Sequence, residues 1–316
     1  MSIIFFHEKT LVNIKLKYKY YFHKIFYYNL SMLWFILTLS AALCWAVGQI
    51  FIKKGFEHIQ PLWNNIFNNI LSLFIYLIPA LWISKFEINT PSFIVFIFIF
   101  TATLLYLGFF YSISRGQLSL TGTIVAGYPI ITAILSYLFL NEHLTVLQYG
   151  GIALILTGGV FVALPDRTEH IKPKHSSWVL WGLLGALTIG TGDFFTKLSV
   201  NSIGSYSHMI FLALISNATS GLNYLLDKKN RKAPKIFHKS FGPTFTGLLI
   251  QLIGAFFFIL AFDYGKVSLV TSVSSVYPAV MVLLAVKFLN EKITRLHIIG
   301  IGVAVCGLII IGLGSW

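Results

Sequence analysis

One stretch of 50 residues occurs twice in this chain, and the repeat limits which folds the chain can adopt. The copies cover residues 116–165 and 265–314, and 16 of the 50 aligned positions are identical without a gap. A constant offset of 149 relates Tyr128-Pro129, Asn141-Glu142 and Thr145 to Tyr277-Pro278, Asn290-Glu291 and Thr294. Each copy holds two long apolar segments joined by a short polar turn. The repeat therefore predicts a duplicated bundle of membrane helices.

Composition supports a membrane protein. Apolar residues make up 57% of the chain, charged residues only 10%, and the mean hydropathy is +0.81. A soluble domain carries roughly 25% charged residues, so the outer surface of this chain must face lipid. The net charge of +13 comes mostly from connectors and from residues 1–31, where basic residues flank membrane segments. It does not indicate nucleic-acid binding. Cys44 and Cys306 fall inside apolar segments and are expected to pack as small hydrophobic side chains.

The first 31 residues form a separate segment in which five lysines alternate with Phe and Tyr. The order of residues does not fit a signal peptide. One interpretation is a basic, aromatic arm that lies on the membrane surface. The other is that translation begins at Met32, immediately before the first apolar run. Mass spectrometry of the N-terminus distinguishes the two.

From Met32 onward the chain has ten apolar runs close to the ~20 residues that a membrane span needs. We expect an all-α membrane protein with ten transmembrane helices. The expected helices cover residues 33–54, 63–83, 92–114, 119–140, 146–164, 178–199, 206–226, 241–264, 268–289 and 295–314.

The repeat also extends upstream of the 50-residue copies. Gly48, Gln49 and Lys53 of the first helix match Gly192, Asp193 and Lys197 of the sixth at an offset of 144. Two five-helix repeats are therefore expected, over residues 33–164 and 178–314, with residues 165–177 as the connector. Five is an odd number, so the second repeat must be inserted in the opposite direction. Inverted repeats place a binding site near the membrane midplane.

These features resemble the EamA-type transporters of the drug/metabolite transporter superfamily. The resemblance rests on five-plus-five helices, a Tyr-Pro pair in the fourth and ninth, an Asn-Glu turn after each, and glycine-rich fifth and tenth helices. It covers about residues 33–314. It implies export of amino acids, metabolites or drugs and does not fix the substrate. The N-terminal arm and the Asp193/Lys197 pair depart from the common pattern.

Asp193 is the sharpest functional signal. A carboxylate within a membrane helix costs on the order of 3 kcal/mol unless it faces a cavity or a partner. Lys197 lies four residues further on, on the same helix face. One hypothesis is that Asp193 titrates or binds a cationic group while Lys197 modulates its protonation. The alternative is a neutralised pair that only braces the bundle.

Other polar and aromatic residues are candidates for a substrate pathway. The prolines interrupt the fourth and ninth helices and free backbone carbonyls, which are tolerated only when buried or facing a wet cavity. Gln49 could form a hydrogen bond either to a substrate or to another helix. The remaining candidates are Lys53, Tyr128, Pro129, Tyr277, Pro278, Trp45, Tyr106, Gln251, Asn69 and Asn217.

Glu142 and Glu291 follow a helix directly and are expected to cap the next one, with Thr145 and Thr294 close to its first turn.

The sequence offers no clustered Cys/His set for a metal, no phosphate-binding loop and no nucleophile elbow. No cofactor is expected, and an enzyme is disfavoured. A secondary transporter of a small organic solute in the plasma membrane is favoured. Transport would be driven by protons or by exchange. Both a monomer and a homodimer are compatible with the sequence. An intramembrane enzyme and a non-transporting membrane partner protein are the alternatives.

The orientation in the membrane stays open. Most lysines and arginines lie in or beside connectors that follow odd-numbered helices. The positive-inside rule places these connectors in the cytoplasm and both termini outside. The family resemblance implies the reverse. A reporter fused after Trp316 decides between them.

Overall fold

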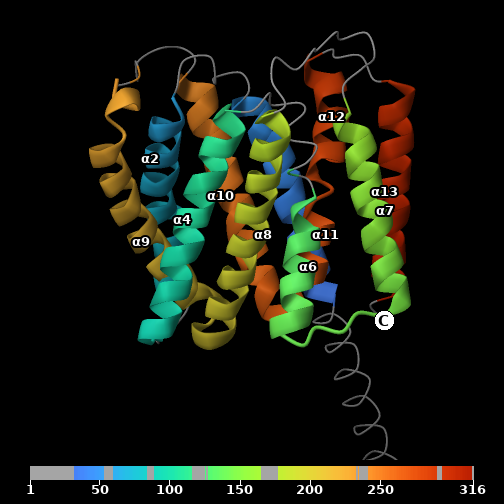
Figure 1. The fold of residues 1–316 in the computed structure, drawn as a ribbon, viewed down its shortest axis with the longest axis horizontal. Coiled ribbons are helices and arrows are strands. Elements are labelled where there is room, and N and C mark those ends of the chain that lie inside the picture. The colour runs from blue at the N-terminus through green and yellow to red at the C-terminus, as the bar shows by residue number, and fades with distance from the viewer. Residues whose placement is uncertain are drawn as a thin grey trace, which may run out of the picture.

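The structure is a computed structural model that describes residues 32–52, 60–83, 89–115, 125, 127–164, 177–232, 234, 241–289 and 294–314. Its helices stand side by side in one bundle, with the C-terminus at the lower edge in Figure 1. We call the side on which α13 ends the C-terminal face. Residues 1–31 of the predicted arm lie outside the described residues.

Where the structure describes them, the helices follow the expected spans, except that the ninth is interrupted after Ser274. Residues 119–124 of the fourth span and 165–176 of the expected connector lie outside the described residues. The first span covers Met32–Ile52, and the second is divided into α2, a π-helical segment η2 and α3. Five of the described helices are each long and apolar enough to cross a membrane. The remaining bounds are α2 Pro61–Ser72, η2 Leu73–Leu77, α3 Ile78–Ile83, α4 Phe93–Arg115, α6 Tyr128–Phe139, α7 Val146–Ala163, α8 Ser177–Ile203, α9 Ser205–Leu226, η3 Lys228–Asn230, α10 Phe241–Tyr264, α11 Val267–Ser274, α12 Tyr277–Leu289 and α13 Arg295–Leu313.

Proline accounts for the division of the second span. Pro79 has no N–H, and its ring clashes with the carbonyl four residues earlier, that of Ile75. The chain accommodates this with the wider turn of η2, which spans Leu73–Leu77. Short π segments within α-helices are frequent at functional sites. Here the segment carries Tyr76, which is buried.

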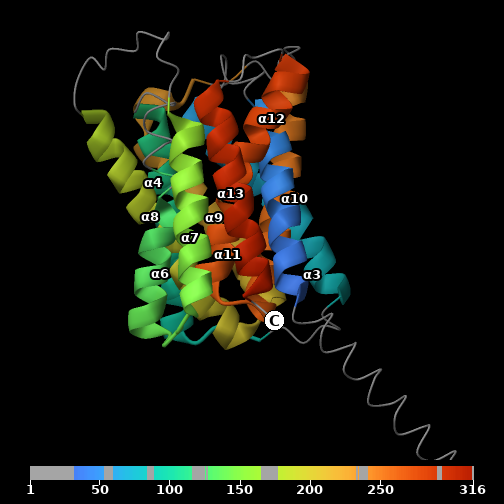
Figure 2. The same ribbon diagram turned by 90° about the vertical axis from the view of Figure 1, so that its right-hand side faces the viewer.

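Contacts between glycines show that the two repeats are inverted. A Cβ on Gly151 would lie 2.9 Å from the carbonyl oxygen of Gly307, and one on Gly158 would lie 2.5 Å from that of Gly300. The residue numbers rise in α7 as they fall in α13, so the two helices are antiparallel. At the repeat offset of 149, Gly151 corresponds to Gly300 and Gly158 to Gly307. Each contact is therefore the symmetry counterpart of the other, as a pseudo-twofold axis between α7 and α13 requires. Figure 2 shows these helices side by side.

A second pair of contacts follows the same symmetry. Gly48 of the first helix packs on α10, where a Cβ would lie 2.7 Å from Cγ of Gln251. Its counterpart Gly192 packs on α4, where a Cβ would lie 3.1 Å from Cε1 of Tyr106. The first helix of each repeat thus contacts the third helix of the other. These crossings bring Gln49 and Asp193, the next residue in each helix, into the interior.

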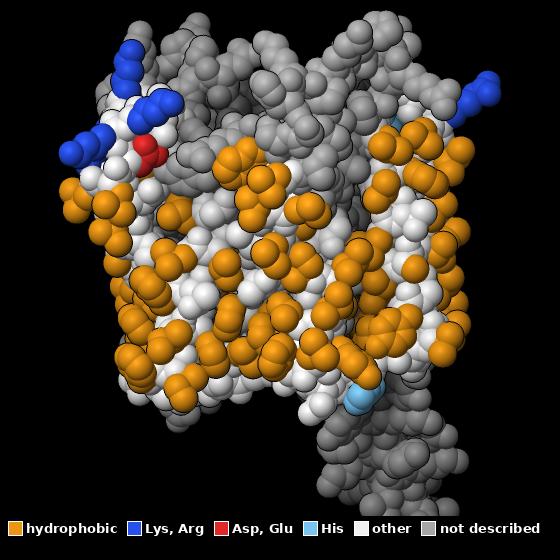
Figure 3. Space-filling view, in the orientation of Figure 1, with side chains coloured by type: hydrophobic (Ala, Val, Ile, Leu, Met, Phe, Trp, Pro, Cys, Tyr) orange, Lys and Arg blue, Asp and Glu red, His pale blue; other side chains and the backbone are white. Residues whose placement is uncertain are grey.

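The outer surface is that of a membrane protein. Hydrophobic side chains cover the middle of the face in Figure 3, and the charged side chains visible there gather near its upper edge. Large apolar side chains such as Trp82 and Phe93 are 85% and 79% exposed. Exposure of this kind across a whole bundle is expected where lipid replaces water.

Candidate functional site

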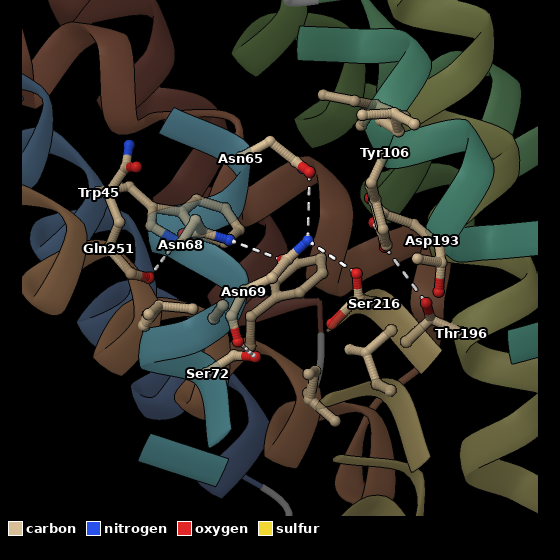
Figure 4. Close-up of a pocket in the computed structure, with 18 of the residues that line it drawn as sticks. Trp45, Asn65, Asn68, Asn69, Ser72, Tyr106, Asp193, Thr196, Ser216 and Gln251 are labelled. Carbon is tan, nitrogen blue, oxygen red and sulfur yellow. Dashed lines mark hydrogen bonds between the residues drawn. The ribbon is translucent and has the colours of Figure 1, made fainter. Parts of the chain in front are cut away.

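A cavity of about 260 Å³ lies between the two repeats. Both repeats supply its walls, and Figure 4 shows Trp45, Asn68 and Gln251 on one side and Tyr106, Asp193 and Thr196 on the other. Of the predicted pathway residues, those that line it are Trp45, Gln49, Asn69, Tyr106, Tyr128, Asp193, Gln251 and Tyr277.

Asp193 brings a carboxylate to the wall of this cavity. Its side chain is only 4% exposed, and its Oδ1 accepts a 2.7 Å hydrogen bond from the hydroxyl of Tyr106. The same hydroxyl lies 3.2 Å from Oγ1 of Thr196. Gly192 allows this arrangement, because a side chain there would press against the Tyr106 ring. Asp193 is the single acid among the described lining residues, and none of those residues is Lys, Arg or His.

Amide side chains form a second wall, between α2 and α9. Nδ2 of Asn69 donates to Oγ of Ser220 at 2.6 Å and to the carbonyl of Ser216 at 3.1 Å. Asn217 does not line the cavity. Its Nδ2 instead donates to the carbonyl of Asn69 at 2.6 Å. In this structure Asn217 therefore joins α9 to α2. Asn65 and Asn68 join Asn69 in the cavity wall.

Aromatic rings form the third wall. Nε1 of Trp45 donates to the carbonyl of Gln251 at 3.2 Å. This bond fixes the indole, whose ring centroid is 5.0 Å from that of Phe258 and 6.1 Å from that of Tyr277. Tyr128 closes the wall from α6, and its hydroxyl lies 2.9 Å from Oγ of Ser274.

Each of the two prolines lies at the start of a helix. Pro129 lies at the start of α6, and α11 ends at Ser274 before α12 begins at Tyr277. The helices are thus interrupted where the Tyr-Pro pairs occur. Neither proline lines the cavity, whereas the tyrosine before each one does.

Lys197 lies away from the cavity. Its Nζ donates to the carbonyl of Phe262, and to that of Gly265 at 3.0 Å. No hydrogen bond or ion pair joins it to Asp193 among the described residues. Lys197 follows Asp193 by one helical turn, as expected. The two side chains nevertheless bind different partners. Lys53, which matches Lys197 in the first repeat, lies outside the described residues. The structure therefore does not test its predicted role.

Glu142 caps a helix, but not the one that follows it. Thr145 and Gln148 form a capping box at the start of α7, which leaves no place there for Glu142. The carboxylate instead accepts from the backbone N–H groups of Val267 and Ser268, at 2.9 and 3.1 Å. Glu142 therefore caps α11 of the other repeat. Glu291 lies outside the described residues.

Several lining residues were missed by sequence reasoning. Asn65, Ser72 and Tyr76 share one face of the second span with Asn68 and Asn69, at helical spacing. That polar stripe within an apolar helix was a usable signal. Thr103, Thr196 and Ser216 carried none, because small hydroxyl residues are common throughout membrane helices.

Comparisons with known proteins agree with this architecture. A model of the EamA-like transporter family matches residues 32–164 and again residues 176–313. The chain is 25% identical over 289 residues to an uncharacterized transporter of Archaeoglobus fulgidus, a match that covers 89% of this chain and 98% of that protein. It is 28% identical over 146 residues to the uncharacterized transporter YvbV of Bacillus subtilis. That second match covers 45% of this chain and spans 48% of the length of YvbV.

A solved structure titled "Crystal structure of protein" has a TM-score of 0.73 at 16% identity, over 88% of this chain and 96% of the other. That likeness concerns the fold alone.

The family model matches both halves, which confirms the duplication of a multi-pass membrane protein. Its members are transporters, which confirms the expectation of a transporter over an enzyme. The chain belongs to the EamA-like transporter family.

Proposed function

We propose that the chain transports a small organic solute bearing a cationic nitrogen, by alternating access to the cavity and in exchange for protons. The observation that carries this proposal is the charge of the cavity wall, which holds Asp193 and no basic side chain among the described lining residues. The membrane is proposed to be the plasma membrane.

The carboxylate of Asp193 is buried in the cavity wall. Removing an ion from water costs several kcal/mol unless a partner compensates. The hydroxyl of Tyr106 supplies one hydrogen bond but no charge. A proton or a cationic ligand supplies the missing charge, and either one occupies the same oxygen atoms. An anionic solute would instead add like charge beside Asp193, so sugar phosphates and carboxylates fit this cavity poorly.

The rest of the wall suits the body of such a solute. The rings of Trp45, Tyr106 and Tyr277 face the cavity, and cations are attracted to aromatic faces. The amides of Gln49 and Asn68 offer donors and acceptors for polar substituents. A volume of about 260 Å³ limits the ligand to a small molecule.

Competition for one carboxylate also provides the coupling. If a proton and the cation exclude one another at Asp193, each crosses in the direction opposite to the other. One monovalent cation exchanged for one proton moves no net charge. Transport of a monovalent cation is therefore expected to follow the pH gradient and to be insensitive to the membrane potential.

The test uses one phenyl scaffold with three charges. Purified protein is reconstituted into vesicles with an acidic interior, and uptake is measured for phenyltrimethylammonium (cation), phenylalanine (zwitterion) and phenyllactate (anion). We expect pH-driven uptake of the cation, slower uptake of the zwitterion and no uptake of the anion. Uptake of phenyllactate in preference to phenyltrimethylammonium would contradict the proposal, as would cation uptake that persists unchanged without the pH gradient.

A further inference from the structure

Glu142 and Lys197 act on the two sides of a single turn. This turn joins the end of α10 at Tyr264 to the start of α11 at Val267. Helix ends leave carbonyls and N–H groups without partners in the helix. A cation favours the carbonyl end of a helix and an anion the N–H end. The α10–α11 turn receives both.

Lys197 holds the carbonyl end. Its Nζ bonds the carbonyls of Phe262 and Gly265, and the side chain is only 9% exposed. Asp263 follows Phe262 directly in α10. Asp263 is itself bonded by Oγ of Ser205 at 2.5 Å, which joins the start of α9 to the same region.

Glu142 holds the N–H end. Besides the two backbone bonds, its Oε2 accepts a 2.6 Å bond from Oγ of Ser268, and the side chain is 8% exposed. Asn141 directs it there with a left-handed φ of 52°, a conformation that Asn tolerates better than most residues. This explains the order of the Asn-Glu pair: the first residue makes the turn and the second reaches α11.

The turn lies between the cavity and the C-terminal face. On α10 the lining residues end at Phe258 and Ile259. One turn further on, Phe262 is 1% exposed, with its ring centroid 4.7 Å from that of Phe258. Lys197 holds the carbonyl of this residue. The contacts of Glu142 and Lys197 thus lie directly behind the cavity wall on this side.

Two features indicate that these contacts can open. α11 is an eight-residue helix separated from α12 by Ser275 and Val276, and residues between two helices can serve as a hinge. The bonds of Glu142 also cross between repeats, from the turn after α6 to α11. A contact that crosses between the repeats beside the cavity is one that rocking of the repeats can change.

We propose that Glu142 and Lys197 are positioning residues that form a turn clamp, the pair together with the backbone of Phe262, Gly265, Val267 and Ser268. The clamp closes the cavity toward the C-terminal face and opens when α11 moves. The same residue types recur in the sequence at Glu291 and Lys53. The proposal does not depend on the charge of the solute.

The test measures how fast a buried reporter cysteine reacts with a water-soluble maleimide. Cys44 and Cys306 are first replaced by alanine. Thr271→Cys then places a thiol in α11, at a residue that is 0% exposed. Ala304→Cys is the matched reporter, 1% exposed on α13. Purified protein in detergent is used without any solute, so failure of the transport proposal leaves the result unaffected.

We expect Glu142→Gln and Lys197→Met each to speed the reaction at Thr271→Cys about tenfold or more, because each removes hydrogen bonds to a charged group. The rate at Ala304→Cys stays the same. Lys197→Arg, which keeps the cation, restores slow reaction. Lys228→Met, which removes an exposed lysine of η3, changes neither rate.

Two results would overturn the turn clamp. The first is an unchanged rate at Thr271→Cys in both Glu142→Gln and Lys197→Met. The second is an equal rise at Thr271→Cys and Ala304→Cys, which would mean that the two residues only stabilise the whole bundle.

Discussion

Replacing Asp193 with asparagine is expected to abolish proton-coupled uptake and to weaken binding of a cationic solute by about 100-fold or more. Removing one member of a buried charge pair costs roughly 3–5 kcal/mol, and each 1.4 kcal/mol is about tenfold in affinity. Asparagine keeps the size of the side chain and can still accept the hydrogen bond from Tyr106. The change therefore removes the charge and little else.

The matched control is Asp227→Asn, which removes a carboxylate from the connector after α9. Asparagine caps helices as well as aspartate does, so this variant should transport at the wild-type rate. Uptake is measured in vesicles, and binding by the ligand-induced rise in melting temperature. Full pH-driven uptake by Asp193→Asn, with its thermal stability intact, would mean that the carboxylate is not the coupling group.

Replacing Gly158 with valine is expected to disrupt the packing of α7 on α13 and to lower folded yield severely. Even a single Cβ at this position would lie 2.5 Å from the carbonyl oxygen of Gly300 and 2.8 Å from Cβ of Ala304. Overpacking a tight interior costs about 1–3 kcal/mol or more. The clash here is with backbone, which cannot turn aside, and it falls on the contact that relates the repeats.

The neighbouring glycine provides the control. A Cβ on Gly159 would meet nothing within 4 Å, so Gly159→Val should fold with little loss. Folded yield after size-exclusion chromatography and the melting temperature compare the two variants. Similar losses at both positions would contradict the packing derived for α7, because the two residues differ only in what lies opposite them.

The repeated sequence was sufficient to predict most of the fold. Spacing alone located the ten spans, and the odd number of spans per repeat predicted inversion, which the α7–α13 contacts confirm. Helix faces were harder to predict. α7 is apolar all round, so its hydrophobic residues do not mark the side that packs on α13. Only the glycines at Gly151 and Gly158, one heptad apart, carried that information.

The candidate site was predicted in part, for a physical reason. Asp193 and Gln49 could be selected because a polar group in a membrane helix needs a partner or a cavity. The partners of Lys197 and Glu142 could not be predicted, since they are backbone atoms of residues distant in the chain. Backbone groups have no residue-specific signature. Local rules suggested the nearest helix instead, so Glu142 was assigned to the start of α7.

The central claim is that the solute crosses through the cavity between the repeats, and a cysteine on its wall tests this most directly. Ser72→Cys introduces a thiol among the lining residues in protein with Cys44 and Cys306 replaced by alanine. Ser199→Cys, at a residue that is 0% exposed and outside the cavity, is the control.

The measurement is uptake of phenyltrimethylammonium before and after treatment with a small water-soluble thiol reagent. We predict that modification of Ser72→Cys stops uptake and that the cation slows the modification, whereas Ser199→Cys is unaffected. Uptake that continues unchanged after complete modification of Ser72→Cys would contradict transport through this cavity.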